Sequence, residues 1–204
     1  MQSPIAPLFD LEARIISLLG VVGDEQINLL VDLLLRLDEE SAKEITLYIS
    51  SQGGDMVQAL KLVDTLRMLR SSVTGVGLGL IEGAGVMLLA SCSRRIVFSN
   101  TLVSTAGLWT IPLSHPDVRK PMGWGGGIDF DQTLTEKLRR QVDRAFEEGS
   151  QKMSGLLGKP DQPPQVLDAA EAIAANLADS IITGAERRLL KPLKQIVHVK
   201  SIAI

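Results

Sequence analysis

The chain has 204 residues, of which 45% are hydrophobic and 22% are charged, and its formal net charge is −3 at pH 7. This length and composition are typical of one soluble domain that buries a core of ordinary size. The sequence has no basic tract, which argues against a nucleic acid partner, and no apolar run of the ~20 residues that a membrane span needs. Residues 1–7 lack the basic and apolar segments of a secretory signal, so a cytoplasmic location is expected.

Short apolar strands alternate with amphipathic helices over most of the chain. Strands are expected at residues 14–20, 45–50, 73–80, 95–98, 102–105 and 181–182. Helices are expected at residues 24–38, 55–70, 84–91 and 168–175, with Asp24 and Asp168 as N-caps. This order implies right-handed βαβ crossovers and a mostly parallel sheet, which is an α/β fold. The single cysteine, Cys92, excludes a disulfide framework within the chain and is expected to pack in the core.

The composition changes after the fifth expected strand. Residues 109–128 are rich in proline and glycine, and a loop of this length is expected to be either functional or mobile. Residues 131–157 follow as one long amphipathic helix, whose apolar stripe needs a partner to cover it. The expected organisation is a single domain over residues 1–182, with a projecting loop and helix at about 109–157 and a C-terminal arm at 183–204.

Two glycine-containing turns each join an apolar strand to the start of a helix. The first contains Gly53 and Gly54, and the second contains Gly83, Ala84 and Gly85. Glycine at such a turn allows a positive φ angle and the close approach of a second backbone. N–H groups at a helix start point outward and favour negative charge, so Gly53, Gly54 and Ala84 are the expected lining of an oxyanion pocket. A nucleophile is missing where one would be expected.

Four segments together resemble the proteolytic subunit of the Clp protease, within the Clp/crotonase superfamily. The segments are Arg14-Ile-Ile-Ser-Leu-Leu-Gly20, Leu47-Tyr-Ile-Ser-Ser-Gln-Gly-Gly54, Arg95-Ile-Val-Phe-Ser-Asn-Thr101, and Leu167-Asp-Ala-Ala-Glu-Ala172 with Leu177-Ala-Asp179. They follow the family's order at nearly the family's spacing, over residues 11–182. The resemblance implies a Clp/crotonase-like α/β fold of repeated βαβ units, with a mostly parallel sheet and a projecting handle helix. It also implies protomers of heptameric rings that stack into a barrel.

The resemblance assigns positions to the family's serine, histidine and aspartate triad, and none of them carries a suitable side chain here. The serine position falls on Gly83, the histidine position on Ala106 and the aspartate position on Pro164. Serine-type hydrolysis needs a hydroxyl, a base that takes its proton and a carboxylate that orients the base. The resemblance therefore implies a non-catalytic subunit, without cofactor or metal. Such a subunit assembles into rings for ATP-dependent protein degradation, alone or beside catalytic paralogues.

Other polar side chains near these positions do not form a triad by themselves. Glu82, directly before Gly83, is the one acid near the lost serine; it is a candidate for a residual acid or base, and exposure to the ring cavity is the simpler interpretation. Ser104 and Thr105 lie near the lost histidine but are expected to have no nearby base of their own. His115 follows Ser114 in the long loop, where a solvated turn is the simpler interpretation.

Two alternative functions remain open, and one docking surface is implied. The first alternative is an active serine peptidase whose rearranged site uses Glu82, Ser104 or His115. The second is a crotonase-like enzyme acting on a coenzyme-A thioester, with Glu82 as acid or base beside the backbone N–H groups. For an AAA+ unfoldase, the resemblance implies a docking pocket in which Tyr48 keeps one family aromatic, whereas Thr46 replaces another.

Overall fold

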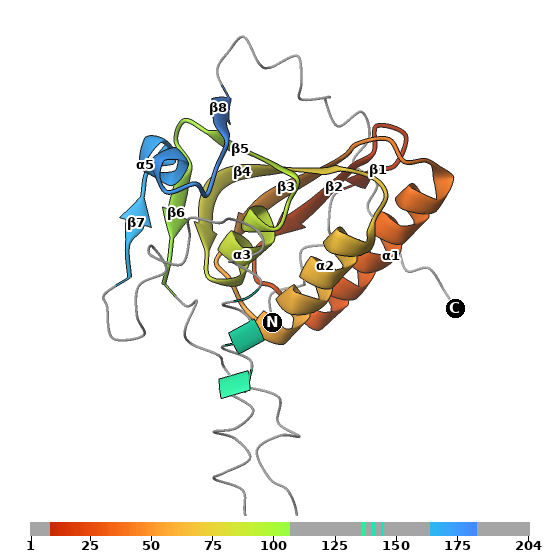
Figure 1. Ribbon diagram of the computed structural model, residues 1–204, viewed down its shortest axis with the longest axis horizontal. Helices are drawn as coiled ribbons and strands as arrows, with labels where there is room; N and C mark the ends of the chain where they lie inside the picture. The colour runs from red at the N-terminus through yellow and green to blue at the C-terminus, as the bar shows by residue number, and fades with distance from the viewer. Residues whose placement is uncertain (1–8, 107–135, 138–139, 142–143, 145–163, 183–204) are drawn as a thin grey trace, which may run out of the picture.

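The computed structural model describes residues 9–106, 136–137, 140–141, 144 and 164–182, and the centre of these residues is one sheet (Figure 1). The main path of the sheet runs in the order β1-β2-β3-β4-β5-β8. Its strands are β1 (Phe9–Asp10), β2 (Ile15–Leu19), β3 (Ile45–Ser51), β4 (Val73–Glu82), β5 (Arg94–Phe98) and β8 (Ser180–Ile182). Neighbours on this path pair in parallel, except that β1 is antiparallel to β2. The prediction of a mostly parallel α/β sheet is confirmed.

β4 belongs to two parts of the sheet. Residues 73–77 pair with β3 and residues 74–77 also pair with β5, whereas residues 80–82 pair with β6 (Leu102–Ser104), and Ile81 keeps a pairing with Ser51 of β3. β6 pairs in turn with β7 (Val166–Leu167), which is antiparallel to it. The change of partner occurs at Gly79, which has φ +65°, a value that glycine adopts without strain. We call residues 80–82, 102–104 and 166–167 the β4–β6–β7 corner.

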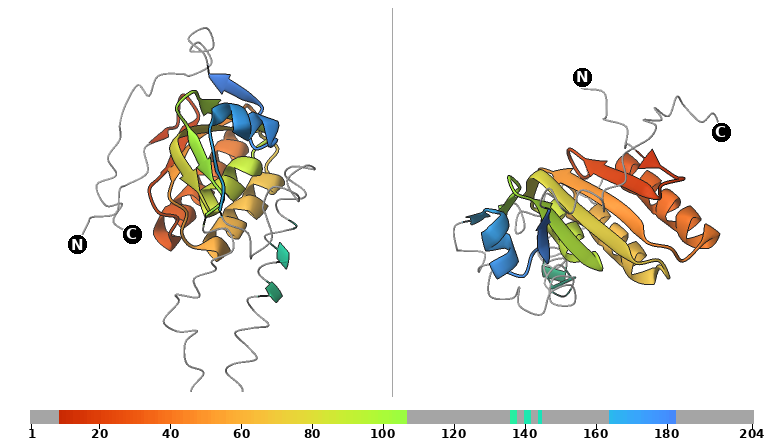
Figure 2. Two further views of the ribbon diagram at one scale, coloured as in Figure 1. Left: turned by 90° about the vertical axis from the view of Figure 1, so that its left-hand side faces the viewer. Right: turned by 90° about the horizontal axis from the view of Figure 1, so that it is seen from above.

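Three helices cover one face of the sheet, as Figures 1 and 2 show. They are α1 (Asp24–Glu40), α2 (Met56–Met68) and α3 (Ala84–Ala90). α1 and α2 each place an apolar stripe on the sheet, at the helical spacing that the sequence predicts. The prediction of Asp24 as the N-cap of α1 is wrong, because the cap is Gly23 and Asp24 is the first helical residue. The carboxylate of Asp24 still lies in the first turn, where the helix dipole favours negative charge.

α3 is buried along its whole length and lies very close to the sheet. A Cβ atom on Gly75 of β4 would lie 2.8 Å from the Sγ of Cys92 and 3.0 Å from the Cδ1 of Leu89. A Cβ atom on Gly85 would lie 3.0 Å from the Cβ of Ser51 on β3. These two glycines therefore permit the short distance between helix and sheet. Cys92 packs in the core as predicted, and burial raises the pKa of its thiol to about 12.

Arg14 forms hydrogen bonds both to the end of α1 and to the segment that leads into β3. The side chain is buried, and its guanidinium donates to the backbone carbonyls of Leu37 (2.9 Å), Ser41 (2.9 Å), Lys43 (3.0 Å) and Glu44 (3.3 Å). The carbonyls at a helix end carry partial negative charge and lack partners within the helix. One buried cation therefore replaces the partners that these carbonyls would otherwise take from water.

The helix predicted at residues 168–175 is present in the carboxyl-terminal part of the described chain. α5 (Ala169–Ala174) begins at Asp168, which forms a capping box with Glu171. β1 and β7 are not expected from the sequence, since two residues show no periodicity. The loop 109–128 and the arm 183–204 lie outside the described residues. Of the expected helix 131–157, residues 136, 137, 140, 141 and 144 are described and are helical.

Candidate functional site

The two glycine turns lie side by side at the carboxyl ends of β3 and β4, as the sequence predicts. Gly53 has φ +84° and Gly54 has φ +144°, values that L side chains rarely adopt. A Cβ atom on Gly53 would lie 3.1 Å from the carbonyl oxygen of Glu82 and 3.3 Å from the nitrogen of Ala84. A Cβ atom on Gly54 would lie only 2.3 Å from the carbonyl oxygen of Val22. The two turns can meet because Gly53 carries no side chain, and the segment at Val22 can approach the first turn because Gly54 carries none.

Gly83 connects β4 to α3 through a sharp turn. Its φ is 51° and its ψ is −120°, which are the angles of the first central residue in a type II′ turn. A strand-to-helix turn of this sharpness is where hydrolases with a nucleophile elbow expose their serine. Gly83 has no side chain, so this turn, residues 82–84, which we call the elbow, presents only its backbone at residue 83.

Ala106, at the position that the resemblance assigns to the base, follows β6. Its N–H donates to the Oγ of Ser104 at 3.2 Å. Ser104 is 3% exposed, and its hydroxyl donates to the Oε1 of Glu82 at 3.0 Å. Glu82 and Ser104 are register partners on β4 and β6. The interpretation that Ser104 has no base nearby is therefore wrong, because strand pairing brings a carboxylate to its hydroxyl.

Pro164, at the position assigned to the aspartate, is exposed just before β7. The next residue, Gln165, exchanges two hydrogen bonds with Thr105. The N–H of Gln165 donates to the Oγ1 of Thr105 at 2.8 Å, and the N–H of Thr105 donates to the carbonyl of Gln165 at 2.9 Å. These bonds hold Pro164 beside the chain segment that carries Ala106. Each assigned position is thus next to a residue that forms a hydrogen bond between two strands or strand ends of the β4–β6–β7 corner. These residues are Glu82, Thr105 and Gln165.

The backbone donors expected to line an oxyanion pocket differ in their partners. The N–H of Gly53 donates to the Oγ of Ser51 at 3.1 Å. Val22 forms an isolated parallel bridge with Gly54, and in such a bridge the N–H of Gly54 points away from Val22. Ala84 is the first residue of α3, so its N–H has no acceptor within the helix. Gly54 and Ala84 are therefore better placed than Gly53 to donate to a bound group.

Two further features are absent from the described residues, a cluster of metal-binding side chains and a membrane-spanning helix. The described residues contain no group of three or more histidine, cysteine, aspartate or glutamate side chains that could hold a metal ion. Among the same residues, no helix combines the length and the apolar composition that crossing a membrane requires. His115 and Ser114 lie outside the described residues.

Tyr48 lies on the sheet face opposite to α1, α2 and α3. Leu47 and Ile49 on either side of it belong to the main core, and side chains alternate along a strand. Tyr48 contacts a second apolar cluster, whose buried members are Val76, Ile96 and Ile182 and whose partly buried members include Phe98. Burial raises the pKa of the Tyr48 hydroxyl.

Arg95 and Asp179 join β5 to the segment that leads into β8. The carboxylate of Asp179 accepts the Arg95 guanidinium at 2.5 Å and the Arg95 N–H at 2.7 Å. Arg95 also donates to the carbonyl of Asn176 at 2.7 Å. Burial raises the pKa of Asp179, but the hydrogen bonds and charge of Arg95 lower it more, so the pKa lies below its ordinary value. This pair fixes the carboxyl-terminal segment to the sheet.

Comparison with known proteins agrees with this architecture. The family model described as Clp protease matches residues 8–185. The chain belongs to the Clp protease family. It is similar to the ATP-dependent Clp protease proteolytic subunit of Streptococcus mutans serotype c, with 28% identity over 185 residues that cover 86% of this chain and 88% of that protein. It is also similar in fold to a ClpP1 mutant from Listeria monocytogenes, with a TM-score of 0.70, 19% identity, and coverage of 86% of this chain and 95% of that chain.

The match to the Clp protease family covers the elbow and the β4–β6–β7 corner, since both lie within residues 8–185. Among the described residues, the elbow offers backbone donors and one carboxylate that is bonded to a serine hydroxyl, but no imidazole. Sequence reasoning missed the hydrogen bond between Glu82 and Ser104, because it depends on the register of two strands that are not consecutive neighbours in the main sheet. The alternation of apolar residues at 81 and 103 is the only sequence signal that places both side chains on one face.

Proposed function

We propose that this member of the Clp protease family is a non-catalytic proteolytic subunit that assembles into rings for ATP-dependent protein degradation. The observation that carries the proposal is Gly83 at the apex of the turn between β4 and α3. Glycine has no atom that can attack a carbonyl group, and Ala106 has none that can take a proton. The rings contain this chain alone or this chain beside catalytic paralogues.

Labelling with a fluorophosphonate probe, followed by mapping of any modified residue, tests the loss of catalysis. The native mass of the same sample, measured by light scattering, tests assembly. We expect no covalent adduct, from a protein whose mass is several times the 22.0 kDa of one chain. A catalytically active Clp subunit serves as the positive control for the probe. Specific labelling of one serine would contradict the loss of catalysis, and a mass of one chain would contradict assembly.

A second candidate function follows from the short distance between Ser104 and Glu82. A carboxylate that accepts a serine hydroxyl at 3.0 Å has the geometry of a base that activates a nucleophile. This reading predicts a rearranged peptidase with Ser104 as the labelled residue. It has less support, because Ser104 is 3% exposed and its Oγ already accepts the N–H of Ala106. Labelling that is lost in both Ser104→Ala and Glu82→Gln would favour it over the non-catalytic subunit.

The proposed docking surface for an AAA+ unfoldase is the apolar cluster around Tyr48. Its support is the partly buried side chain of Tyr48, which packs on the buried side chains of Val76 and Ile96, its register neighbours across β4 and β5. A charged side chain in this row would oppose burial of an apolar loop from a partner. We expect Tyr48→Asp to weaken unfoldase binding to assembled rings in a sedimentation assay. Unchanged binding would remove Tyr48 from the docking surface.

A further inference from the structure

The β4–β6–β7 corner exposes apolar side chains on three adjacent strands. Leu80 is 38% exposed, Leu102 is 44% exposed and Val166 is 61% exposed. Leu80 and Leu102 are register partners, and Val166 pairs with Ser104, two residues beyond Leu102. Side chains alternate along a strand, so these three residues share one face, and Val103 on the opposite face is fully buried. We call Leu80, Leu102 and Val166 the corner patch.

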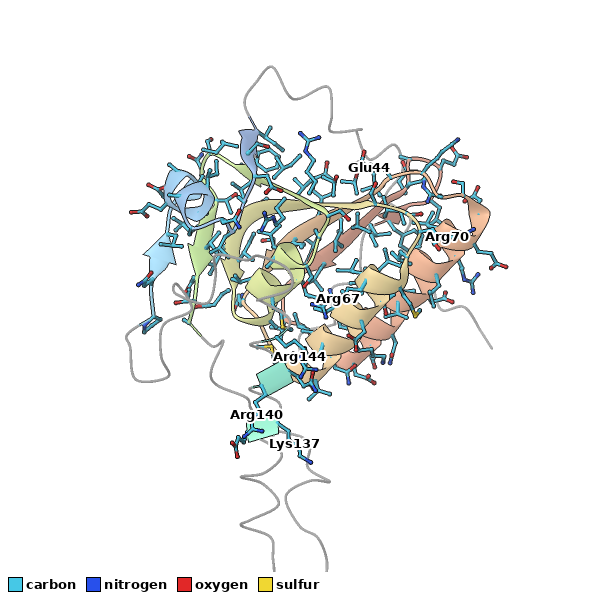
Figure 3. All side chains as sticks on the ribbon, viewed as in Figure 1. Glu44, Arg67, Arg70, Lys137, Arg140 and Arg144 are labelled. Atoms are coloured by element: carbon cyan, nitrogen blue, oxygen red, sulfur yellow. The ribbon has the colours of Figure 1, made fainter. Side chains whose placement is uncertain are left out.

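The charged side chains of the segments around the corner patch are all acidic. Lysine and arginine are absent from the segments that form the corner and the neighbouring helices α3 and α5, which are residues 78–92, 99–106 and 164–175. Glu82 lies on the same face as the patch, and Asp168 and Glu171 are exposed at the start of α5. Figure 3 shows Arg70 beside α2, across the body of the protein from β6 and β7. A ligand for the patch therefore combines apolar contact area with basic groups.

The size of the corner patch fits a short extended chain. Neighbouring strands lie about 4.8 Å apart, so the patch spans roughly 10 Å from β4 to β7. An extended polypeptide advances about 3.3 Å per residue, so about four residues cross this span. A standard interface between two folded proteins uses about 20–30 residues on each side, far more than the three side chains of the patch. The patch therefore suits a short unfolded segment better than a folded partner.

We propose that the corner patch binds extended segments of unfolded polypeptide whose apolar side chains are flanked by lysine or arginine. In an extended chain every second side chain lies on the same face, so two apolar side chains can pack on the patch while the flanking basic side chains reach its acids. The exposed ion pairs contribute little affinity, but they select against acidic segments. The inference rests on the proposed function for the source of these segments, because a ring that degrades proteins contains unfolded polypeptide. It gives the non-catalytic subunit a role in holding that polypeptide.

Three labelled peptides test the chemistry of the ligand on the full-length wild-type protein. The probe is fluorescein-labelled Lys-Ser-Leu-Ser-Leu-Ser-Lys, which places two leucines and two flanking lysines on one face when extended. In the second peptide glutamate replaces both lysines, and in the third serine replaces both leucines. Fluorescence anisotropy over a protein titration gives each dissociation constant. We expect the acidic peptide to bind at least about fivefold more weakly than the probe, and the serine peptide at least about tenfold more weakly.

Variants of the chain locate the binding site. Glu82→Gln removes the charge and keeps a side-chain oxygen as an acceptor. Leu102→Ser combined with Val166→Ser removes apolar contact area at two exposed positions. We call these two proteins the corner variants. The matched controls are Glu39→Gln, at an exposed position on α1, and Met68→Ser, at a position on α2 that is 71% exposed.

The two corner variants are expected to lose affinity to different extents. Glu82→Gln is expected to weaken binding of the probe about two- to fivefold at low salt, and less at high salt, because it removes one exposed ion pair. The double serine variant is expected to weaken it at least about tenfold, and both controls are expected to bind as the wild type. Circular dichroism shows whether each variant is folded, and the comparison of the three peptides needs no variant.

The outcomes separate this inference from the proposed function. Equal affinity of the wild type for the three peptides would overturn the inference, whether or not rings form. A preference for the probe that persists in both corner variants would place the binding elsewhere and would also overturn it. A changed native mass of the double serine variant with unchanged peptide affinity would assign the corner to a contact between copies instead.

Loss of the preference in the corner variants alone supports the inference. Mass spectrometry of the probe after the titration shows whether it stays intact. Cleavage of the probe, or a fluorophosphonate adduct on the protein, would contradict the loss of catalysis and leave the corner patch as the binding site.

Discussion

Replacing Gly83 with serine restores the missing hydroxyl and tests the elbow in two ways. The first is stability. The combination of φ 51° and ψ −120° at Gly83 is unfavourable for a residue with a Cβ atom, by about 1–3 kcal/mol. For a chain of this size, 1 kcal/mol changes the Tm by about 2–4 °C. Gly83→Ser is therefore expected to lower the Tm by about 2–12 °C in thermal unfolding followed by circular dichroism.

The second property is reactivity. The new hydroxyl is expected to react with a fluorophosphonate probe no faster than an ordinary serine, because Ala106 cannot take its proton. Adding Ala106→His supplies a base, and general-base catalysis typically contributes about 10²–10⁴-fold. The double variant is therefore expected to label faster than Gly83→Ser by a factor in this range, as measured by the time course of adduct formation.

Gly20 provides the matched control for the stability measurement. It has φ +84°, and a Cβ atom there would meet nothing within 4 Å, so Gly20→Ser tests the conformational cost away from the site. If Gly20→Ser lowers the Tm and Gly83→Ser does not, the conformation assigned to the elbow is refuted. If Gly83→Ser labels rapidly without Ala106→His, the argument that the site lacks a base is refuted.

Three further predictions concern buried and bonded side chains. Arg14→Met is expected to lower the free energy of unfolding in urea by about 3–5 kcal/mol, since four carbonyls lose a charged donor and such bonds contribute about 1.5–3 kcal/mol each, less than additively. Cys92, with a pKa of about 12, is expected to resist iodoacetamide at pH 8 in the folded protein and to react fully in urea; rapid native alkylation would contradict its burial. Hydrogen bonds from Ser71 lower the pKa of Asp38 from 3.8 to about 2, so Asp38 stabilises the fold above pH 3.8 and this contribution is lost as the pH falls toward 2. Asp38→Asn should flatten the acid limb of a stability-versus-pH curve, and an unchanged limb would exclude this role.

The main sheet was predictable because its strands are short apolar runs, of which β2 is buried on both faces and β3 alternates buried with partly buried residues. Such strands are runs of Ile, Leu and Val, and they stand out between glycine turns and amphipathic helices. β1 and β7 have two residues each, which is too short for any periodicity to appear. The cap of α1 was misplaced by one residue, because aspartate is favoured both at the cap and in the first turn.

The site was predictable only in part. Parallel strands end at the same edge of a sheet, so the turns at Gly53 and Gly83 were expected to meet, and they do. The hydrogen bond between Glu82 and Ser104 joins residues 22 positions apart, and only the pairing of β4 with β6 decides that they meet. The N–H of Gly53 donates to the Ser51 hydroxyl instead of pointing toward a bound group, and no pattern in the sequence predicts this hydrogen bond.

The close approach of α3 to the sheet affects where this chain can accept mutations. Gly75 and Gly85 lie where α3 contacts the sheet. A Cβ atom on Gly75 would lie 2.8 Å from the Sγ of Cys92, and a Cβ atom on Gly85 would lie 3.0 Å from the Cβ of Ser51. Any larger residue at either position would push the helix outward and move Gly83 with it, because a packed interior has little free volume. Positions 106 and 164, by contrast, lie outside α3 and outside its contact with the sheet, whereas Gly83 is the N-cap of the helix. Substitutions at Gly75 and Gly85 are therefore expected to disturb the backbone of the turn at Gly83 although neither residue lies in that turn.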